Sequence, residues 1–160
     1  FNEAKVWAKS KVPLSTEEGD DEVYFDNIDA KSIYFEDPAG NIVEFICRLS
    51  DATASHEPFS AASLQKMSEM SLVVQNKLEA YSLLQHVGIF NRSDEEILPT
   101  GLTFMGDRAD ATYLLLVNEG RTWYFSTKPS VSYPLSLTLT NGALISIDDN
   151  RQLYCTTKVQ

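Results

Sequence analysis

Apolar and polar residues alternate along residues 31–36, where Ile33 and Phe35 fall on one side of the chain and polar residues fall on the other. This two-residue period predicts a half-buried β-strand. A DPAG sequence follows, and each of its residue types suits a tight turn that ends in a left-handed glycine. Residues 41–48 are apolar on both faces, which is typical of a strand that is covered on both sides. The pattern therefore predicts a β-hairpin over residues 32–48.

One carboxylate, Glu44, lies in the apolar second strand of this hairpin, between Ile42 and Ile46. We therefore expect it to be at least partly buried. A buried carboxylate needs a metal, a cation or a proton to offset its desolvation. An ion pair with Arg48, further along the same face, and a functional role are both compatible with the pattern.

The rest of the chain predicts two amphipathic helices and several further strands. The first helix covers residues 1–11, with Asn2 as its cap, and Pro13 ends it. The second helix begins after Asn76, which is followed three residues later by a glutamate, and ends at Gly88. Strands are expected at residues 23–25, 64–74, 100–105, 111–117, 121–125, 133–140, 142–147 and 152–157.

Small and polar residues, together with a proline, fill residues 50–63, a composition typical of a linker. The linker contains His56, which we expect in solvent, because a lone histidine in such a segment is rarely a ligand. The order before the linker is helix and three strands, and after it strand, helix and further strands. We therefore predict one unit over residues 1–49 and a second over residues 64–160.

The run YFEDPAGNIVEF resembles the hallmark hairpin of the vicinal oxygen chelate superfamily, which includes glyoxalases, bleomycin-resistance proteins and extradiol dioxygenases. The resemblance implies an α+β fold of βαβββ modules, with a mostly antiparallel, cupped sheet around a metal or ligand site. It also implies that residues 1–49 lack the first strand of their module, so we expect the chain to be incomplete at its N-terminus. The later segments SEMSLVVQN and GRTW resemble uncharacterised glyoxalase-like proteins and imply a second, degenerate module.

In the metal-dependent members, the glutamate on the strand after this turn is a metal ligand, and Glu44 matches that position. Glu69 matches a first-strand position that is often His or Glu. The resemblance thus implies a possible divalent ion (Fe, Mn, Zn, Ni or Mg). The chain departs from the pattern where a second carboxylate is expected, because the strand there carries Ser136, Thr138 and Thr140. Metal catalysis needs several ligands together with open positions for the substrate.

A second candidate site follows the turn at Gly120. Arg121 and Trp123 could hold an anionic or planar ligand, through the guanidinium fork and through stacking. The alternative is a packed aromatic strand with the arginine in water.

The 160-residue chain carries a formal net charge of −10, which argues against nucleic acid or an anionic membrane surface as a partner. No apolar run reaches transmembrane length. Cys47 and Cys155 lie far apart and form no metal-binding spacing, which favours the reducing cytoplasm. An incomplete module with an open sheet edge predicts a homodimer.

Three functions are compatible with the sequence. The first is a metal-dependent glyoxalase-like or dioxygenase-like enzyme acting on a small, oxygen-bearing substrate. The second is a metal-free protein that binds a small molecule, like the bleomycin-resistance proteins, and the third is an inactive scaffold of the same fold. We expect the first function for the full-length protein, while its catalytic residues are not identified by the sequence.

Overall fold

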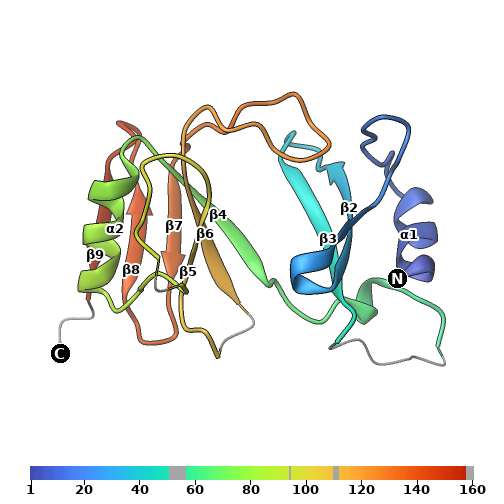
Figure 1. The fold of residues 1–160 in the computed structure, drawn as a ribbon, viewed down its shortest axis with the longest axis horizontal. Helices are drawn as coiled ribbons and strands as arrows, with labels where there is room; N and C mark the ends of the chain where they lie inside the picture. The colour runs from blue at the N-terminus through green and yellow to red at the C-terminus, as the bar shows by residue number, and fades with distance from the viewer. Residues whose placement is uncertain (51–56, 94, 110–111, 158–160) are drawn as a thin grey trace. The chain divides into compact units, whose positions relative to one another are not determined.

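The computed structural model describes residues 1–50, 57–93, 95–109 and 112–157 (Figure 1). These residues form two α-helices and three small sheets that are mostly antiparallel. The α+β fold class expected from the sequence is therefore confirmed, and the arrangement is consistent with a glyoxalase-like fold. The chain divides into two compact units: unit 1 comprises Phe1–Lys66 and Thr122–Lys128, and unit 2 comprises Met67–Arg121 and Pro129–Gln160.

Unit 1 is an antiparallel sheet of three strands with a helix on one face. Its elements are α1 (Asn2–Lys9), β1 (Val23–Phe25), the 3₁₀ helix η1 (Asp26–Ile28), β2 (Ala30–Glu36), β3 (Ile42–Arg48) and the 3₁₀ helix η2 (Ala61–Ser63). The strands follow the order β1-β2-β3. The predicted hairpin is confirmed as β2 and β3.

The turn of this hairpin is held by the side chain of Asp37. Its Oδ1 accepts hydrogen bonds from the backbone N–H groups of Ala39 (2.9 Å) and Asn41 (2.8 Å). Gly40 has a φ of +83°, the left-handed conformation that the turn requires. The side-chain amide of Asn41 and then these backbone donors hold the pKa of Asp37 below its usual value.

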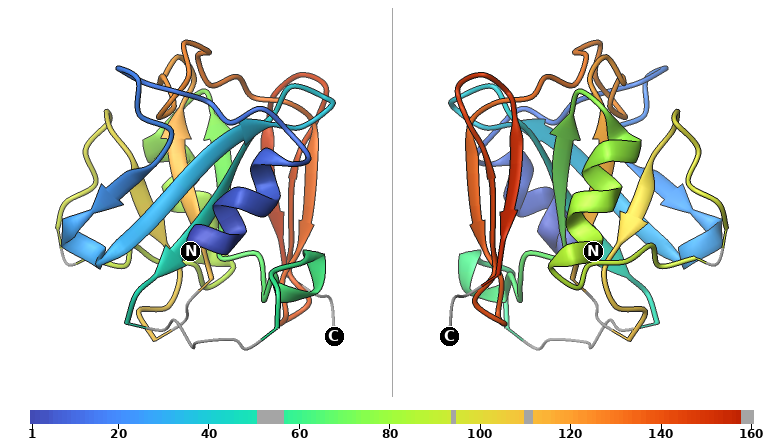
Figure 2. Two further views of the ribbon diagram at one scale, coloured as in Figure 1. Left: turned by 90° about the vertical axis from the view of Figure 1, so that its right-hand side faces the viewer. Right: turned by 90° about the vertical axis from the view of Figure 1, so that its left-hand side faces the viewer.

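Helix α1 covers one face of this sheet (Figure 2, left). The Trp7 ring stacks on Phe45 with 6.3 Å between ring centroids, and Phe45 contacts Phe35 at 5.1 Å. Asn2 is not the helix cap, which corrects the prediction. Asn2 is the first helical residue, the N-cap is Phe1, and no side chain among the described residues caps the helix there.

Unit 2 contains the remaining two sheets and the second helix. Its elements are β4 (Glu69–Val74), α2 (Lys77–His86), β5 (Thr103–Met105), β6 (Tyr113–Asn118), β7 (Leu135–Thr138), β8 (Leu144–Ile147) and β9 (Leu153–Thr156). One sheet has the order β4-β6-β5, with β4 parallel to β6, and the other has the antiparallel order β7-β8-β9. The predicted C-terminal hairpin is confirmed as β8 and β9.

Helix α2 lies over the β4-β6-β5 sheet (Figure 2, right), and its buried face joins one core with both sheets. Leu84 of α2 packs in this core with Leu72 of β4 and Ile145 of β8, and all three side chains are fully buried. The predicted helix ends are confirmed. Asn76 Oδ1 accepts the Glu79 N–H at 3.2 Å, and Gly88 follows the helix with a φ of +82°.

Several predicted strands differ from the structure. Residues 121–125 do not form one of the strands. Tyr124 and Phe125 lie in a turn, where Phe125 has a φ of +55° and both rings pack on Tyr34 of unit 1. The expected strand over residues 64–74 begins only at Glu69, and residues 133–140 form the shorter β7.

Part of the predicted linker, residues 51–56 with His56, lies outside the described residues. The predicted boundaries at 1–49, 50–63 and 64–160 stay predictions. Within the described part of the chain, no helix has the length and apolar character that a membrane crossing requires.

Candidate functional site

Glu44 lies in β3 directly opposite Tyr34 of β2 in the antiparallel register. The Tyr34 hydroxyl donates a hydrogen bond of 2.7 Å to Glu44 Oε1. Glu44 is half-buried, as expected, and Tyr34 is buried. A cross-strand hydroxyl therefore fixes one oxygen of this carboxylate in the sheet face that α1 does not cover.

Aromatic rings from residues Thr122–Lys128, called the aromatic segment below, cover the same face. The Phe125 ring stacks on Tyr34 with 5.4 Å between centroids and 17° between planes. Tyr124 stacks on Tyr34 at 6.4 Å and contacts Phe25 edge-on at 5.4 Å. The chain leaves unit 2 after Arg121. The aromatic segment then reaches the β2–β3 hairpin, and the chain continues in unit 2 from Pro129 (Figure 1). The surroundings of Glu44 are therefore more aromatic than its own hairpin alone would make them.

The aromatic segment also corrects the prediction that β2 is half-buried. Ser32 and Tyr34, on the side of the strand expected to face water, are 0% and 6% exposed. Tyr34 is covered by a segment about ninety positions further along the chain, which the local pattern does not reveal.

Glu69 has a closely similar environment in unit 2. It pairs with Tyr113 across the parallel strands β4 and β6, and the Tyr113 hydroxyl donates to Glu69 Oε1 at 2.8 Å. The guanidinium of Arg92 lies over the Tyr113 ring, 4.4 Å from its centroid. These side chains lie on the opposite face of the sheet from Leu72, which packs against α2.

The two units thus share a plan in which the helix covers one sheet face and a tyrosine–glutamate hydrogen bond lies on the other. The sequence predicted both glutamates as candidate ligands, which stays a prediction, and it did not indicate Tyr34 and Tyr113. Tyr34 was detectable in principle, because hairpin register places it opposite Glu44. The parallel pairing of Glu69 with Tyr113 joins positions 44 residues apart and has no local signal.

A metal ion needs several donor side chains close together. In the parts of the chain that the structure describes, no three His, Cys, Asp or Glu side chains are grouped so as to hold a metal ion. Glu44 and Glu69 belong to different units. Hydrogen bonding to a carboxylate is a common feature of metal ligands, but a ligand set also needs further donors. The described residues therefore do not fit a complete three-ligand metal site.

The other predicted pair, Arg121 and Trp123, is divided between the units. Arg121 ends a segment of unit 2, where its N–H donates to Ser130 Oγ at 3.0 Å and its carbonyl accepts the Ser130 N–H at 2.7 Å. Trp123 belongs to unit 1 and is half-buried. Ligand binding by these two residues stays a prediction.

The α+β fold, with its mostly antiparallel sheets, is consistent with a glyoxalase-like fold. Residues 67–121 match the model of the family described as toxoflavin-degrading enzyme, which is a member of the vicinal oxygen chelate and glyoxalase-like superfamily. The match runs from the start of unit 2 through β6, so it includes Glu69 and Tyr113 but not the hairpin of Glu44. No curated protein matches the chain.

Proposed function

We propose that this chain forms part of a glyoxalase-like enzyme that acts on a small, oxygen-bearing substrate, with Glu44 at the site of reaction. The observation that carries the proposal is the Tyr34–Glu44 hydrogen bond on the sheet face that α1 leaves uncovered. It is supported by two separate segments, the hairpin of residues 32–48 and the family match of residues 67–121. A carboxylate held in a partly buried, aromatic setting can act as a metal ligand or as a proton acceptor.

If the enzyme uses a divalent ion, Glu44 in unit 1 and Glu69 in unit 2 are the candidate ligands, each within its own unit. Since the described residues do not complete a ligand set, further donors must come from other residues or from a second chain. Tyr34 and Tyr113 would then orient the two carboxylates.

The first experiment measures the metal content of the purified protein and of two variants. Glu44→Gln keeps the size of the side chain and an acceptor for Tyr34, but it removes the charge that a cation needs. The matched control is Glu36→Gln, since Glu36 lies in the same unit and pairs with Lys128 at 2.6 Å. A ligand role for Glu44 predicts that a divalent ion bound to the wild type and to Glu36→Gln is lost in Glu44→Gln. Equal metal content in all three proteins would refute a ligand role for Glu44.

The second experiment measures turnover, with toxoflavin as the first probe because the matching family is named for its degradation. The protein is incubated with toxoflavin in the presence of Fe, Mn, Zn, Ni or Mg, and loss of the compound is followed by chromatography. Loss of toxoflavin that requires the protein and does not occur with Glu44→Gln supports the enzyme function.

A second candidate function, metal-free binding of a small molecule, is favoured by the aromatic cover on Tyr34. Binding of toxoflavin without its loss, unchanged by chelator, would support this alternative.

The homodimer expected from the sequence is also a proposal. β3 lies at the edge of its sheet in unit 1, and an edge strand presents backbone groups that can pair with another chain. Light scattering at several concentrations tests the homodimer, and a monomer at every concentration would contradict it.

We further propose a cytoplasmic location, because Cys47 and Cys155 are free thiols and a reducing compartment keeps thiols in that state.

A further inference from the structure

Tyr113 in unit 2 contacts a guanidinium, a second aromatic ring and a carboxylate. The guanidinium of Arg92 lies over its ring, 4.4 Å from the centroid, and the Phe104 ring meets it edge-on with 5.5 Å between centroids. The Tyr113 hydroxyl donates to Glu69 Oε1 at 2.8 Å. A cation, a phenol and a carboxylate therefore form one chain of contacts, and the proposed function uses only the last two.

The backbone of Arg92 belongs to the sheet that holds Tyr113. The Arg92 N–H donates to the carbonyl of Phe104 at 2.9 Å, and the Gly106 N–H donates to the carbonyl of Phe90 at 2.8 Å. The chain after α2 therefore extends the β4-β6-β5 sheet beyond its edge strand β5. Tyr113 lies in β6, the neighbour of β5, so backbone pairing brings Arg92 close to the tyrosine ring.

The side chain of Arg92 is held by the turn after β5. Its Nη2 donates to the carbonyl of Arg108 at 3.1 Å, and its Nη1 donates to the carbonyl of Asp107. Arg108 Nε donates in return to the carbonyl of Arg92. Two consecutive carbonyls thus hold the planar fork of the guanidinium, which keeps the cation over the Tyr113 ring.

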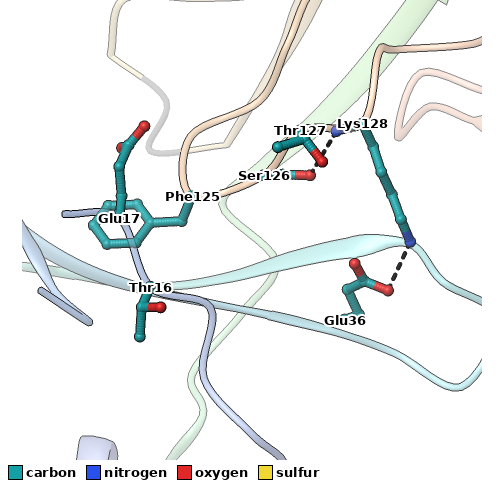
Figure 3. A pocket seen from close by; sticks show the side chains of 7 residues that line it. All are labelled: Thr16, Glu17, Glu36, Phe125, Ser126, Thr127 and Lys128. Carbon is teal, nitrogen blue, oxygen red and sulfur yellow. Dashed lines mark hydrogen bonds and ion pairs between the residues drawn. The ribbon is translucent and has the colours of Figure 1, made fainter. Parts of the chain in front are cut away.

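The corresponding tyrosine of unit 1 has a different cover. The Tyr34 ring is stacked on Phe125 of the aromatic segment. Lys128, the cation of that segment, donates to Glu36 Oε2 at 2.6 Å (Figure 3). The stacked cover of Tyr34 is thus an uncharged ring, whereas a guanidinium lies over the ring of Tyr113.

A cation over an aromatic face is attracted by the ring quadrupole and draws electron density from the ring. In a tyrosine, this withdrawal makes the hydroxyl a stronger donor. Its hydrogen bond to a carboxylate is already one of the stronger kinds, and polar contacts that follow one another polarise each other. Through Tyr113, the guanidinium of Arg92 therefore acts on Glu69 Oε1.

We propose that Arg92 is a positioning residue for Glu69. Its guanidinium strengthens the hydrogen bond from the Tyr113 hydroxyl and thereby fixes the orientation of the Glu69 carboxylate. The inference rests on the proposed function only where it takes Glu69 as part of the reactive site. The contacts that carry it lie within unit 2 and within residues 67–121, the segment that matches the family model.

The test is a double-mutant cycle on the full chain, with stability measured by urea unfolding. Arg92→Met removes the cation and keeps an apolar side chain of similar length, and Glu69→Gln removes the charge of the acceptor. We expect the two changes to be non-additive by about two- to fivefold in the unfolding equilibrium constant, the range of one cation–π contact near a surface. Arg92→Lys retains a cation and should recover part of this coupling.

The same cycle is repeated in the Tyr113→Phe background, which keeps the ring and removes the hydroxyl. The coupling between Arg92 and Glu69 should then disappear. A coupling that persists unchanged would overturn the proposal, because direct Coulomb attraction between the two charges would account for it. Additive effects in the presence of the Tyr113 hydroxyl would overturn it as well.

Arg108→Met is the matched control, since it breaks the bond to the Arg92 carbonyl and leaves the Arg92 guanidinium in the chain. Its effect on stability should add to that of Glu69→Gln. A coupling as large as that of Arg92→Met would show that the turn, and not the charge of Arg92, acts on Glu69, which would also overturn the proposal. Because only unfolding is measured, either result leaves the proposed enzyme function unaffected, and a failure to degrade toxoflavin leaves this coupling unaffected.

Discussion

At the scale of single residues, the cross-strand tyrosines decide the environment of the two candidate carboxylates. Tyr34 and Tyr113 each donate a hydroxyl to a glutamate that lies opposite on the neighbouring strand. A hydrogen bond to a charged group stabilises more than one between neutral groups, and it also restricts the rotamer of the acceptor. The tyrosines are therefore positioning residues for Glu44 and Glu69.

Replacing Tyr34 by Phe should lower the free energy of unfolding by about 1–2 kcal/mol, because Glu44 loses a donor in a partly buried place. Tyr24→Phe is the control. The Tyr24 hydroxyl donates a hydrogen bond to Asp29 on an exposed surface, where water takes the place of the hydroxyl that the variant lacks. Urea unfolding followed by fluorescence measures both variants. Equal losses of unfolding free energy in the two variants would show that the Tyr34 hydroxyl stabilises the protein no more than an exposed tyrosine hydroxyl does.

Burial of the Lys77 ammonium makes the free energy of unfolding depend on pH. It is 1% exposed, and its ammonium donates to the carbonyls of Thr100 (3.2 Å) and Gly101 (3.1 Å). Burial lowers the pKa of Lys77 below its usual 10.5. The unfolded chain therefore binds this proton more tightly than the folded chain. Between the two pKa values, unfolding takes up a proton, and the free energy of unfolding rises with pH.

Lys77→Met removes this titration. The stability of the wild type relative to the variant should increase as the pH rises from the lowered pKa towards 10.5. Chemical denaturation at a series of alkaline pH values measures the difference. A difference that stays constant, or falls, over that range would contradict the lowered pKa of Lys77.

At the scale of elements, α2 depends on packing more than on its own sequence. A helix of ten residues is marginal in isolation, but its buried face joins β4, β6, β8 and β9 in one core. The Asn76 cap and Gly88 define where this helix begins and ends. Its stability therefore comes chiefly from the apolar residues that it buries.

Leu84→Ala should destabilise unit 2 by about 2–5 kcal/mol, because it opens a cavity in a fully buried part of the core. Leu78→Ala, in the same helix, is the matched control. Leu78 is 45% exposed, so its truncation leaves no internal cavity. Thermal or urea unfolding compares the two variants, and a loss of similar size in both would contradict the assigned core.

At the scale of the whole molecule, the aromatic segment shows that neither unit is one continuous stretch of the chain. Residues 122–128 are preceded and followed by unit 2, yet they pack on unit 1. Ring contacts with Tyr34 and the ion pair of Lys128 with Glu36 hold them there. Cutting the chain between Lys66 and Met67 would therefore separate unit 1 from a segment that belongs to it.

Lys128→Met should loosen this segment without unfolding unit 1. Because an exposed ion pair contributes at most about 1 kcal/mol, we expect amide hydrogen exchange in residues 124–126 to quicken about threefold. Arg151→Met is the matched control, since it breaks the Arg151–Glu119 pair in unit 2 at a similar exposure. Unchanged exchange in Lys128→Met would show that the aromatic rings alone hold the segment.

The sequence by itself determined the features that depend on neighbouring residues. The β2–β3 hairpin and the Asn76 cap follow from side-chain period and from turn or cap chemistry, which act over a few residues. The α+β class followed from the family resemblance of that hairpin. Tertiary structure alone decided the burial of Tyr34, the partner of Glu69 and the turn at Phe125. These depend on strand register and on packing between segments tens of residues apart, where the free energy of contact outweighs local preference.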